Sequence, residues 1–155
     1  MSYSNFHLEI MAADHLVFNG QATQVNLPTS DGRVGILAGH SNLIMAVISG
    51  TIDFDAVASE SLDSESRNSR SITEPGRHTI VVSNGIIKVE NGEVIILVGT
   101  AERPEEIDET RARRAEEEAR AKLKRANTNR DHAMAEAELH RAMSRIKASR
   151  STHKL

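Results

Sequence analysis

Short runs of apolar residues recur through the first hundred positions of the chain, and most are separated by Gly, Asn or Ser. Many short runs with this spacing predict β-strands that pack as a sandwich or barrel. Asn91-Gly92 favours a two-residue type I′ hairpin, because both residues adopt positive φ at low cost. Asn19-Gly20 is interpreted as a turn for the same reason. The predicted strands are Phe6–Met11, Gln24–Pro28, Val34–Leu37, Asn42–Ile48, Thr51–Phe54, His78–Ser83, Ile86–Glu90 and Glu93–Val98.

The segment 56–74 interrupts this pattern. Residues 58–66 read Ala-Ser-Glu-Ser-Leu-Asp-Ser-Glu-Ser, which is too polar to build a packed pair of strands. We interpret the segment as an exposed hairpin excursion from the β half. A phosphorylation or docking role is the alternative interpretation.

After Arg103 the spacing of apolar residues becomes that of helices, with one every three or four positions. Pro104 suits a first helical turn, and the acidic residues after it complement the helix dipole. Asn127-Thr128-Asn129 predicts a turn in which Thr128 or Asn129 caps the second helix. The two apolar stripes are Ala112, Ala115, Ala119, Leu123 and Ala126, and Ala135, Leu139, Ala142, Met143 and Ile146.

The chain therefore divides into a β domain, 1–103, and an antiparallel two-helix hairpin, 104–155. The seam of this hairpin is mostly alanine, so it buries little apolar area at roughly 25 cal/mol per Å². That gain is small against the entropy of ordering the helices. The hairpin should be able to undock or melt while the β domain stays folded, which predicts a switch. A static two-helix appendage is the alternative.

The net charge of −3 conceals an asymmetry between the two halves. Residues 1–103 carry 6 Lys/Arg and 12 Asp/Glu, and residues 104–155 carry 13 and 10, which gives −6 and +3. We expect the two halves to contact different partners. Nucleic-acid binding is not expected, because the basic residues alternate with Glu and aromatic residues make up only 3%.

Several kinds of chemistry are absent from the sequence. The chain has no Cys, which excludes disulfides and thiolate sites, and no apolar run of the roughly 20 residues that a membrane helix needs. Neither a signal peptide nor a presequence is recognisable at residues 1–5. His132, Glu136 and His140 share one helix face but lack a further ligand, so we interpret them as solvated. We expect no catalytic residue, no metal site and no direct membrane insertion, and infer that the chain acts by contact.

Ordered motifs along nearly the whole chain carry a resemblance. Residues 25–40 read Val-Asn-Leu-Pro-Thr-Ser-Asp-Gly-Arg-Val-Gly-Ile-Leu-Ala-Gly-His, and residues 107–112 match an (I/L)DxxRA motif at every fixed position. With the stretches 83–103 and 141–146, they resemble the epsilon subunit of the F-type (rotary) ATP synthase. Residues 56–77 lack a clear counterpart.

The resemblance implies an all-β sandwich of about ten strands followed by an antiparallel two-helix hairpin. It implies a non-catalytic rotor subunit of the central stalk in a proton-translocating ATP synthase, which couples the gamma subunit to the c-ring at the cytoplasmic face of the bacterial inner membrane. Arg33 and His40 align with the edge that faces the c-ring. Arg33 replaces an acidic residue, so we expect a different charge pattern at that contact. A free-standing scaffold with a helical dimerisation arm is the alternative function.

The resemblance also implies that the hairpin inhibits ATP hydrolysis when it extends along gamma, where the basic tail would meet an acidic loop of the beta subunit. No cofactor is expected except a regulatory ATP, which some bacterial members bind with the hairpin folded down. Glu118 stands where a basic residue is expected and would repel phosphate, and Asp108 has the alternative role of an N-cap. The residues that match the nucleotide-binding site are Glu102, Ile107, Asp108, Arg111, Ala112, Arg141 and Arg145.

Overall fold

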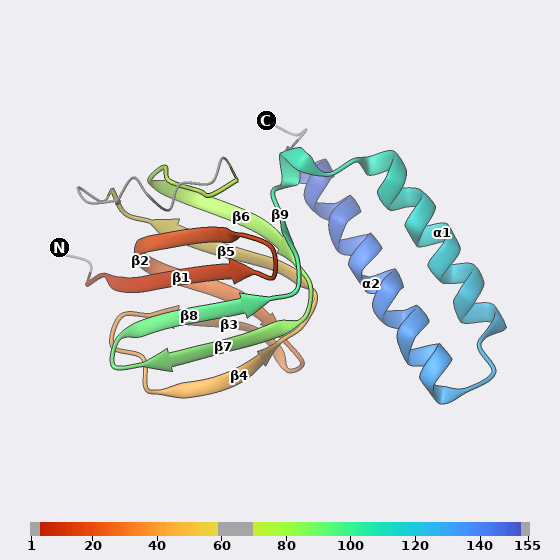
Figure 1. Ribbon diagram of the computed structural model, residues 1–155, viewed down its shortest axis with the longest axis horizontal. Coiled ribbons are helices and arrows are strands. Elements are labelled where there is room, and N and C mark those ends of the chain that lie inside the picture. Colours follow the sequence, from red (N-terminus) through yellow and green to blue (C-terminus); the bar gives the residue numbers. More distant parts are fainter. Residues whose placement is uncertain (1–3, 59–69, 153–155) are drawn as a thin grey trace.

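The computed structural model describes residues 4–58 and 70–152, and these form a β-sandwich with a pair of antiparallel helices beside it (Figure 1). The Ser-rich residues 59–69 of the expected excursion lie outside the described residues. The strands are β1 (Phe6–Ala12), β2 (Leu16–Thr29), β3 (Gly32–Leu37), β4 (Leu43–Val47), β5 (Gly50–Ala56), β6 (Gly76–Val82), β7 (Gly85–Glu90), β8 (Glu93–Val98) and β9 (Ala101–Glu102).

The strands follow the order β4-β7-β8-β1-β2-β5-β6-β9, with β3 paired to β2 outside this path. The 14-residue strand β2 joins the two layers, because its first half pairs with β1 and its second half with β3 and β5. The register shifts at Ile10/Met11 and again between Ala22 and Gln24, and such irregularities bend a strand. β1 and β8 are parallel, and the other pairs are antiparallel.

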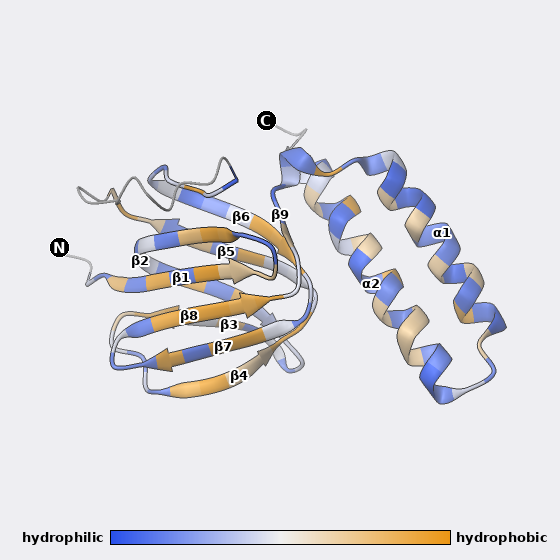
Figure 2. Ribbon diagram, in the orientation of Figure 1, coloured by the Kyte–Doolittle hydropathy of each residue, from blue (hydrophilic) through white to orange (hydrophobic). Residues whose placement is uncertain are grey.

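The core lies between the two layers and takes the inward side chains of each strand. Hydrophobic residues are concentrated on the strands, whereas the helices are mostly hydrophilic (Figure 2). Leu8, Ile52 and Ile96 are completely buried there, and each side chain of this size contributes about 1.5–3 kcal/mol by burial. The rings of Phe18 and Phe54 pack 4.8 Å apart between their centroids. Burial of these side chains explains why short runs of apolar residues predicted the strands.

The turn at Asn91-Gly92 is confirmed as a two-residue hairpin between β7 and β8, because φ is +52° at Asn91 and +82° at Gly92 and Glu90 pairs with Glu93. The turn expected at Asn19-Gly20 is wrong. Both residues lie inside β2, and the Phe18 ring covers Gly20 so closely that a Cβ there would meet it at 3.1 Å.

Two α-helices, α1 (Glu109–Arg125) and α2 (Asn129–Thr152), follow a short 3₁₀ helix, η2 (Pro104–Glu106). Pro104 does not start the first α-helix as predicted. It starts η2, and Ile107 then has an extended backbone that separates η2 from α1. Thr128 is confirmed as the cap of α2, because its Oγ1 accepts a hydrogen bond from the Asp131 amide at 3.1 Å.

The fold class is confirmed: a β-sandwich is followed by an antiparallel two-helix arm. The described residues contain nine strands, against an expected number of about ten. The strand that sequence analysis missed entirely is β9, whose two residues pair with Val81 and Val82 of β6. A two-residue strand carries too short a pattern to be recognised in a sequence.

Candidate functional site

The candidate functional site is the junction between the sandwich and the hairpin. α2 lies between α1 and the sandwich and contacts β5, β6 and η2 (Figure 1). Ile80 and Val82 of β6 point into the core, so Val81 between them points outward. Val81 is nevertheless only 5% exposed, because α2 covers it, and it lines a crevice together with Arg141 and Arg145. The hairpin is therefore docked on the sandwich.

Glu102 and Arg145 form an ion pair across this junction. The Arg145 Nε donates to Glu102 Oε2 at 2.7 Å, and Nη2 donates to Oε1 at 3.3 Å. The pair is bidentate and about one third exposed on each side, and charge-assisted pairs of this geometry are stronger than ordinary hydrogen bonds. Since β9 positions Glu102 and α2 positions Arg145, the pair connects the sandwich directly to the hairpin.

The alanine seam predicted within the hairpin is present, although Met143, predicted as a member, is 46% exposed. Its buried members come from both helices and are mostly small, with Ile146 as the largest. They are Ala112, Ala119, Ala135, Ala142 and Ile146. Small side chains allow the helices to approach closely but remove little apolar surface from water, so the seam is as thin as the sequence predicted.

Ion pairs join the two helices near both ends of the hairpin. Near the turn, Lys122 Nζ lies 2.8 Å from Glu138 Oε2, and this carboxylate raises the pKa of Lys122. Near the junction, Glu109 Oε1 lies 3.5 Å from Arg150 Nε. The pKa of Glu109 is lowered, mainly by its hydrogen bond from Arg113 and also by Arg150. Each end of the hairpin therefore carries an ion pair between partly exposed side chains of the two helices.

The residues of the expected nucleotide site fall into two groups. Glu102, Arg141 and Arg145 line one crevice between α2 and the sandwich. This crevice has a volume of about 10 Å³, roughly the room that one water molecule needs. In the docked arrangement Arg145 is already paired with a carboxylate, so a phosphate there would have to compete with Glu102.

The other group lies at the start of α1. Asp108 is the N-cap of α1 and accepts a hydrogen bond from the Arg111 amide at 3.1 Å. Arg111 is exposed, and its guanidinium makes no hydrogen bond or ion pair with the residues that the structure describes. Ala112 is buried in the seam, and Ile107 is half-buried. Sequence analysis gave Asp108 both a ligand role and a capping role, and the capping role is observed.

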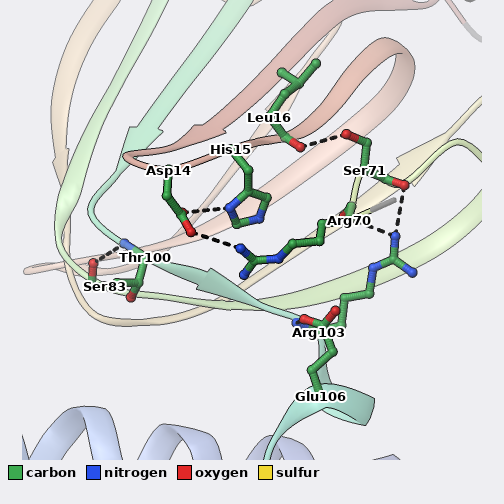
Figure 3. A network of polar contacts seen from close by, with 9 residues as sticks. All are labelled: Asp14, His15, Leu16, Arg70, Ser71, Ser83, Thr100, Arg103 and Glu106. Carbon is green, nitrogen blue, oxygen red and sulfur yellow. Dashed lines mark hydrogen bonds and ion pairs between the residues drawn. The ribbon is translucent and has the colours of Figure 1, made fainter. Parts of the chain in front are cut away.

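Sequence analysis did not identify the polar network around the connection between the domains (Figure 3). Arg103 donates through Nη2 to the carbonyl oxygens of Arg70 and Ser71, at 3.3 and 3.0 Å. Arg70 in turn pairs with Asp14 at 2.9 Å. Hydrogen bonds with His15 and then with Arg70 lower the pKa of Asp14. No motif marks these residues, because their partners are distant in the sequence.

Arg33 and His40, predicted at a common edge, lie near opposite ends of β3. Arg33 follows the first residue of the strand and pairs with Asp53 of β5 at 2.8 Å. It also donates to the carbonyl oxygen of Thr51 at 3.0 Å. His40 lies in the turn after β3, where its Nδ1 is 2.9 Å from the carbonyl oxygen of Ser41. The positive charge of Arg33 is thus partly neutralised by Asp53 of the same domain.

An exposed row of apolar side chains crosses the outer face of the layer that contains β4, β7, β8 and β1. Ala46 pairs with Ile86, Ile86 with Leu97, and Leu97 with Met11, so the four side chains lie side by side. Ile86, Leu97 and Met11 are 47%, 40% and 36% exposed. We call these four residues the apolar row. Exposed apolar residues that form a continuous patch are typical of interaction sites.

Comparisons with known proteins agree with this architecture. The family model described as the ATP synthase delta/epsilon chain β-sandwich domain matches residues 5–104. The model of the long α-helix domain of the same chain matches residues 105–150. The chain belongs to the epsilon-subunit family of F-type ATP synthases. An epsilon chain is an accessory subunit of this enzyme and is not itself catalytic.

Similar proteins come from bacteria and from mitochondria. The epsilon chain of Bordetella avium is 33% identical over 136 residues, which cover 88% of this chain and 85% of the relative. That of Nitratidesulfovibrio vulgaris is 32% identical over 143 residues, covering 92% and 94%. A chain with the same fold is present in the structure of the Euglena gracilis mitochondrial ATP synthase, which contains OSCP, F1 and the c-ring. The TM-score is 0.69 and the sequence identity 22%, and the match covers 90% of this chain and 78% of that chain.

Neither a membrane-spanning helix nor a metal cluster is found within residues 4–58 and 70–152. No helix in these ranges is long and apolar enough to cross a membrane. No group of three or more His, Asp or Glu in the same ranges could hold a metal ion. His132 and Glu136 share a helix face as expected, and both are exposed. The His132 Nδ1 lies 3.9 Å from Glu136 Oε2.

Proposed function

We propose that this chain is a rotor subunit of the central stalk that joins the gamma subunit to the c-ring and regulates ATP hydrolysis through its hairpin. Membership of the epsilon family supports the rotor role. A chain of the same fold also occurs in a structure described as the central stalk and c-ring of the Tetrahymena thermophila mitochondrial enzyme. The observation that carries the proposal is the apolar row, which the docked hairpin leaves exposed.

The apolar row is the surface that we assign to gamma. Its centre, Ile86 and Leu97, is apolar and exposed on two adjacent strands that the hairpin turn at Asn91-Gly92 holds in register. Burial of apolar anchors at the centre of an interface provides most of its affinity. The opposite layer is occupied at β5 and β6 by the docked α2. The outer face of β4, β7, β8 and β1 therefore remains free of the hairpin and offers an exposed apolar surface to a rigid partner.

The test is binding of purified gamma to Ile86→Asp. A charge at the centre of the row should weaken binding at least about tenfold, because the carboxylate would lose its water on docking. Leu37→Asp is the matched control, since Leu37 is 58% exposed but lies on β3, outside the row. Equal affinity of Ile86→Asp and the unsubstituted chain would reject this surface. If the chain does not bind gamma at all, the free-standing scaffold with a dimerisation arm becomes the better hypothesis.

Contact with the c-ring is assigned to the turns at the ends of β3. His40 is the better candidate, because Arg33 already pairs with Asp53 of β5. With partners of this kind, the chain would lie at the cytoplasmic face of the bacterial inner membrane without entering it. The bacterial relatives support this location.

Regulation is assigned to the hairpin in its extended state, where it would meet the acidic loop of beta. Deleting residues 104–155 should raise ATP hydrolysis by the assembled enzyme. The deletion leaves the sandwich core intact, because every core residue precedes Pro104. Unchanged hydrolysis with normal assembly would remove the inhibitory role but leave the coupling role in place.

A regulatory ATP is the finer part of the proposal. Its phosphates would contact the exposed Arg111, together with Arg141 and Arg145 of α2. Because Arg145 is paired with Glu102, ATP would bind at the expense of that ion pair. A ligand that binds only the docked hairpin would stabilise the docked state by mass action.

A further inference from the structure

Arg103 is the covalent connection between the two domains, since β9 ends at Glu102 and η2 begins at Pro104. Its guanidinium turns back to the sandwich and donates from Nη2 to two carbonyl oxygens of the loop before β6, those of Arg70 and Ser71 (Figure 3). Its Nε is buried and has no hydrogen-bond partner among the described residues. A buried donor without a partner is costly, so the two bonds from Nη2 must offset this cost for the side chain to stay in place.

The loop that accepts these bonds is itself fixed to the start of β2. Ser71 Oγ donates to the carbonyl oxygen of Leu16 at 2.8 Å, and the Ile72 amide donates to that of Val17 at 2.8 Å. Ile72 is 6% exposed and belongs to the core of the sandwich. The acceptors for Arg103 are therefore part of the rigid body, not of a freely moving loop.

On the other side, Arg103 is bound to the hairpin. Its amide donates to Glu106 Oε2 at 3.2 Å, and the Glu106 amide donates to the Arg103 carbonyl oxygen at 3.0 Å. This reciprocal capping makes η2 move with Arg103, and α2 packs on η2. A rotation of the hairpin away from the sandwich would thus pull the Arg103 guanidinium from its two acceptors.

The packing beside this contact is open. A cavity of about 590 Å³ lies next to it, bounded by the loop before β6, the start of β6, η2 and the end of α2, with Arg77, Arg103 and Ser151 in its wall. Because side chains do not fill this part of the junction, apolar contacts contribute little to its stability. The polar bonds of Arg103 therefore have a larger share in holding the hairpin here than they would have in a closely packed interface.

We propose that Arg103 and the carbonyl oxygens of Arg70 and Ser71 form a latch that keeps the hairpin docked on the sandwich. Arg70 and Ser71 lie near the end of the segment 56–74, which has no counterpart in the family pattern. In this proposal they control how readily the hairpin undocks. The inference deepens the regulation given under the proposed function. Its test uses the isolated chain, so it does not depend on gamma, the c-ring or hydrolysis.

The test measures how often the hairpin undocks. The chain contains no Cys, so a single Val81→Cys substitution places one thiol under α2, where a maleimide reaches it only after undocking. Ile80→Cys, one residue earlier and pointing into the core, reports opening of the sandwich itself. The labelling rate of each thiol is proportional to the population of the corresponding open state.

Removing the latch with Arg103→Ala should increase labelling at Val81→Cys about ten- to hundred-fold, the change expected when hydrogen bonds from a charged donor are lost. Labelling at Ile80→Cys should stay near its original rate. Arg77→Ala is the matched control, because Arg77 lines the same cavity and makes no side-chain bond with the described residues. An unchanged rate with Arg103→Ala, or an equal increase with Arg77→Ala, would overturn the latch.

If Arg103→Ala accelerates labelling at both thiols, the substitution has destabilised the sandwich itself. A milder variant is then needed to test the latch. Ser71→Ala removes the bond that ties the accepting loop to Leu16 but leaves Arg103 in place. The latch predicts a smaller increase, confined to Val81→Cys. No increase with Ser71→Ala would then reject the latch. A failure of the chain to bind gamma, by contrast, would count against the proposed function but would not change these labelling rates.

Discussion

The ion pair between Glu102 and Arg145 provides a quantitative test of how the hairpin is held. Glu102→Gln keeps the shape of the side chain but removes its charge. Exposed pairs contribute about 0.2–1 kcal/mol and hydrogen bonds to charged groups about 1.5–3 kcal/mol. A bidentate pair one third exposed on each side lies between these limits, so we expect a loss of about 1–2 kcal/mol. The ratio of undocked to docked hairpin should rise about five- to thirty-fold.

Labelling of a thiol at Val81→Cys measures this ratio, with Ile80→Cys as the report on the sandwich. Arg120→Gln is the control, because Arg120 makes a similar two-bond pair with Glu116 inside α1 and does not touch the sandwich. In a double-mutant cycle, Arg145→Gln should add little once Glu102 has been replaced. The reasoning fails if Glu102→Gln leaves the labelling rate unchanged, or if Arg120→Gln accelerates it as much.

Three further predictions concern the turn into β7, the hairpin and its ligand. Gly85→Ala should lower the free energy of unfolding in urea by about 1–3 kcal/mol, because its Cβ would lie 1.9 Å from a carbonyl oxygen of β8; a neutral effect would contradict this packing. Arg113 and Arg150 lower the pKa of Glu109. The stability that these contacts give to the hairpin is therefore complete above the ordinary carboxylate pKa and disappears as the pH falls through the lowered value. Helicity measured by circular dichroism should decrease in acid, and less steeply in Glu109→Gln. Calorimetric titration with ATP should detect binding that Arg111→Ala abolishes, and absence of heat with the unsubstituted chain would remove ATP from the proposal.

The strands could be predicted because each has its own local pattern. β7 and β8 are short runs rich in apolar residues on either side of a turn that needs two positive φ angles, and this information is contained in a dozen neighbouring residues. The misread turn at Asn19-Gly20 shows the limit of local information. The Phe18 ring lies over Gly20 within β2 and leaves little room for a Cβ, and that packing depends on residues from elsewhere in the core.

The junction could be predicted only in part. The alanine stripes showed which helix faces meet, and family resemblance selected Glu102 and Arg145. Nothing in the sequence pairs Arg103 with Ser71, which lies 32 positions away. Such contacts depend on the tertiary path of the chain and leave no periodicity. For the same reason, the apolar row became visible only once the register between strands was known.

The way in which the hairpin is held suits a reversible contact. Glu102 and Arg103 are adjacent, yet the first binds α2 and the second binds the loop before β6, so the sandwich and hairpin are joined by a few directional polar bonds. The apolar contribution is small, with Val81 on one side and an alanine-rich helix on the other. Because undocking exposes little apolar surface, a partner needs only a modest preference for the extended hairpin to shift the population. A larger apolar interface would hold the hairpin more firmly but would require a correspondingly stronger partner to release it.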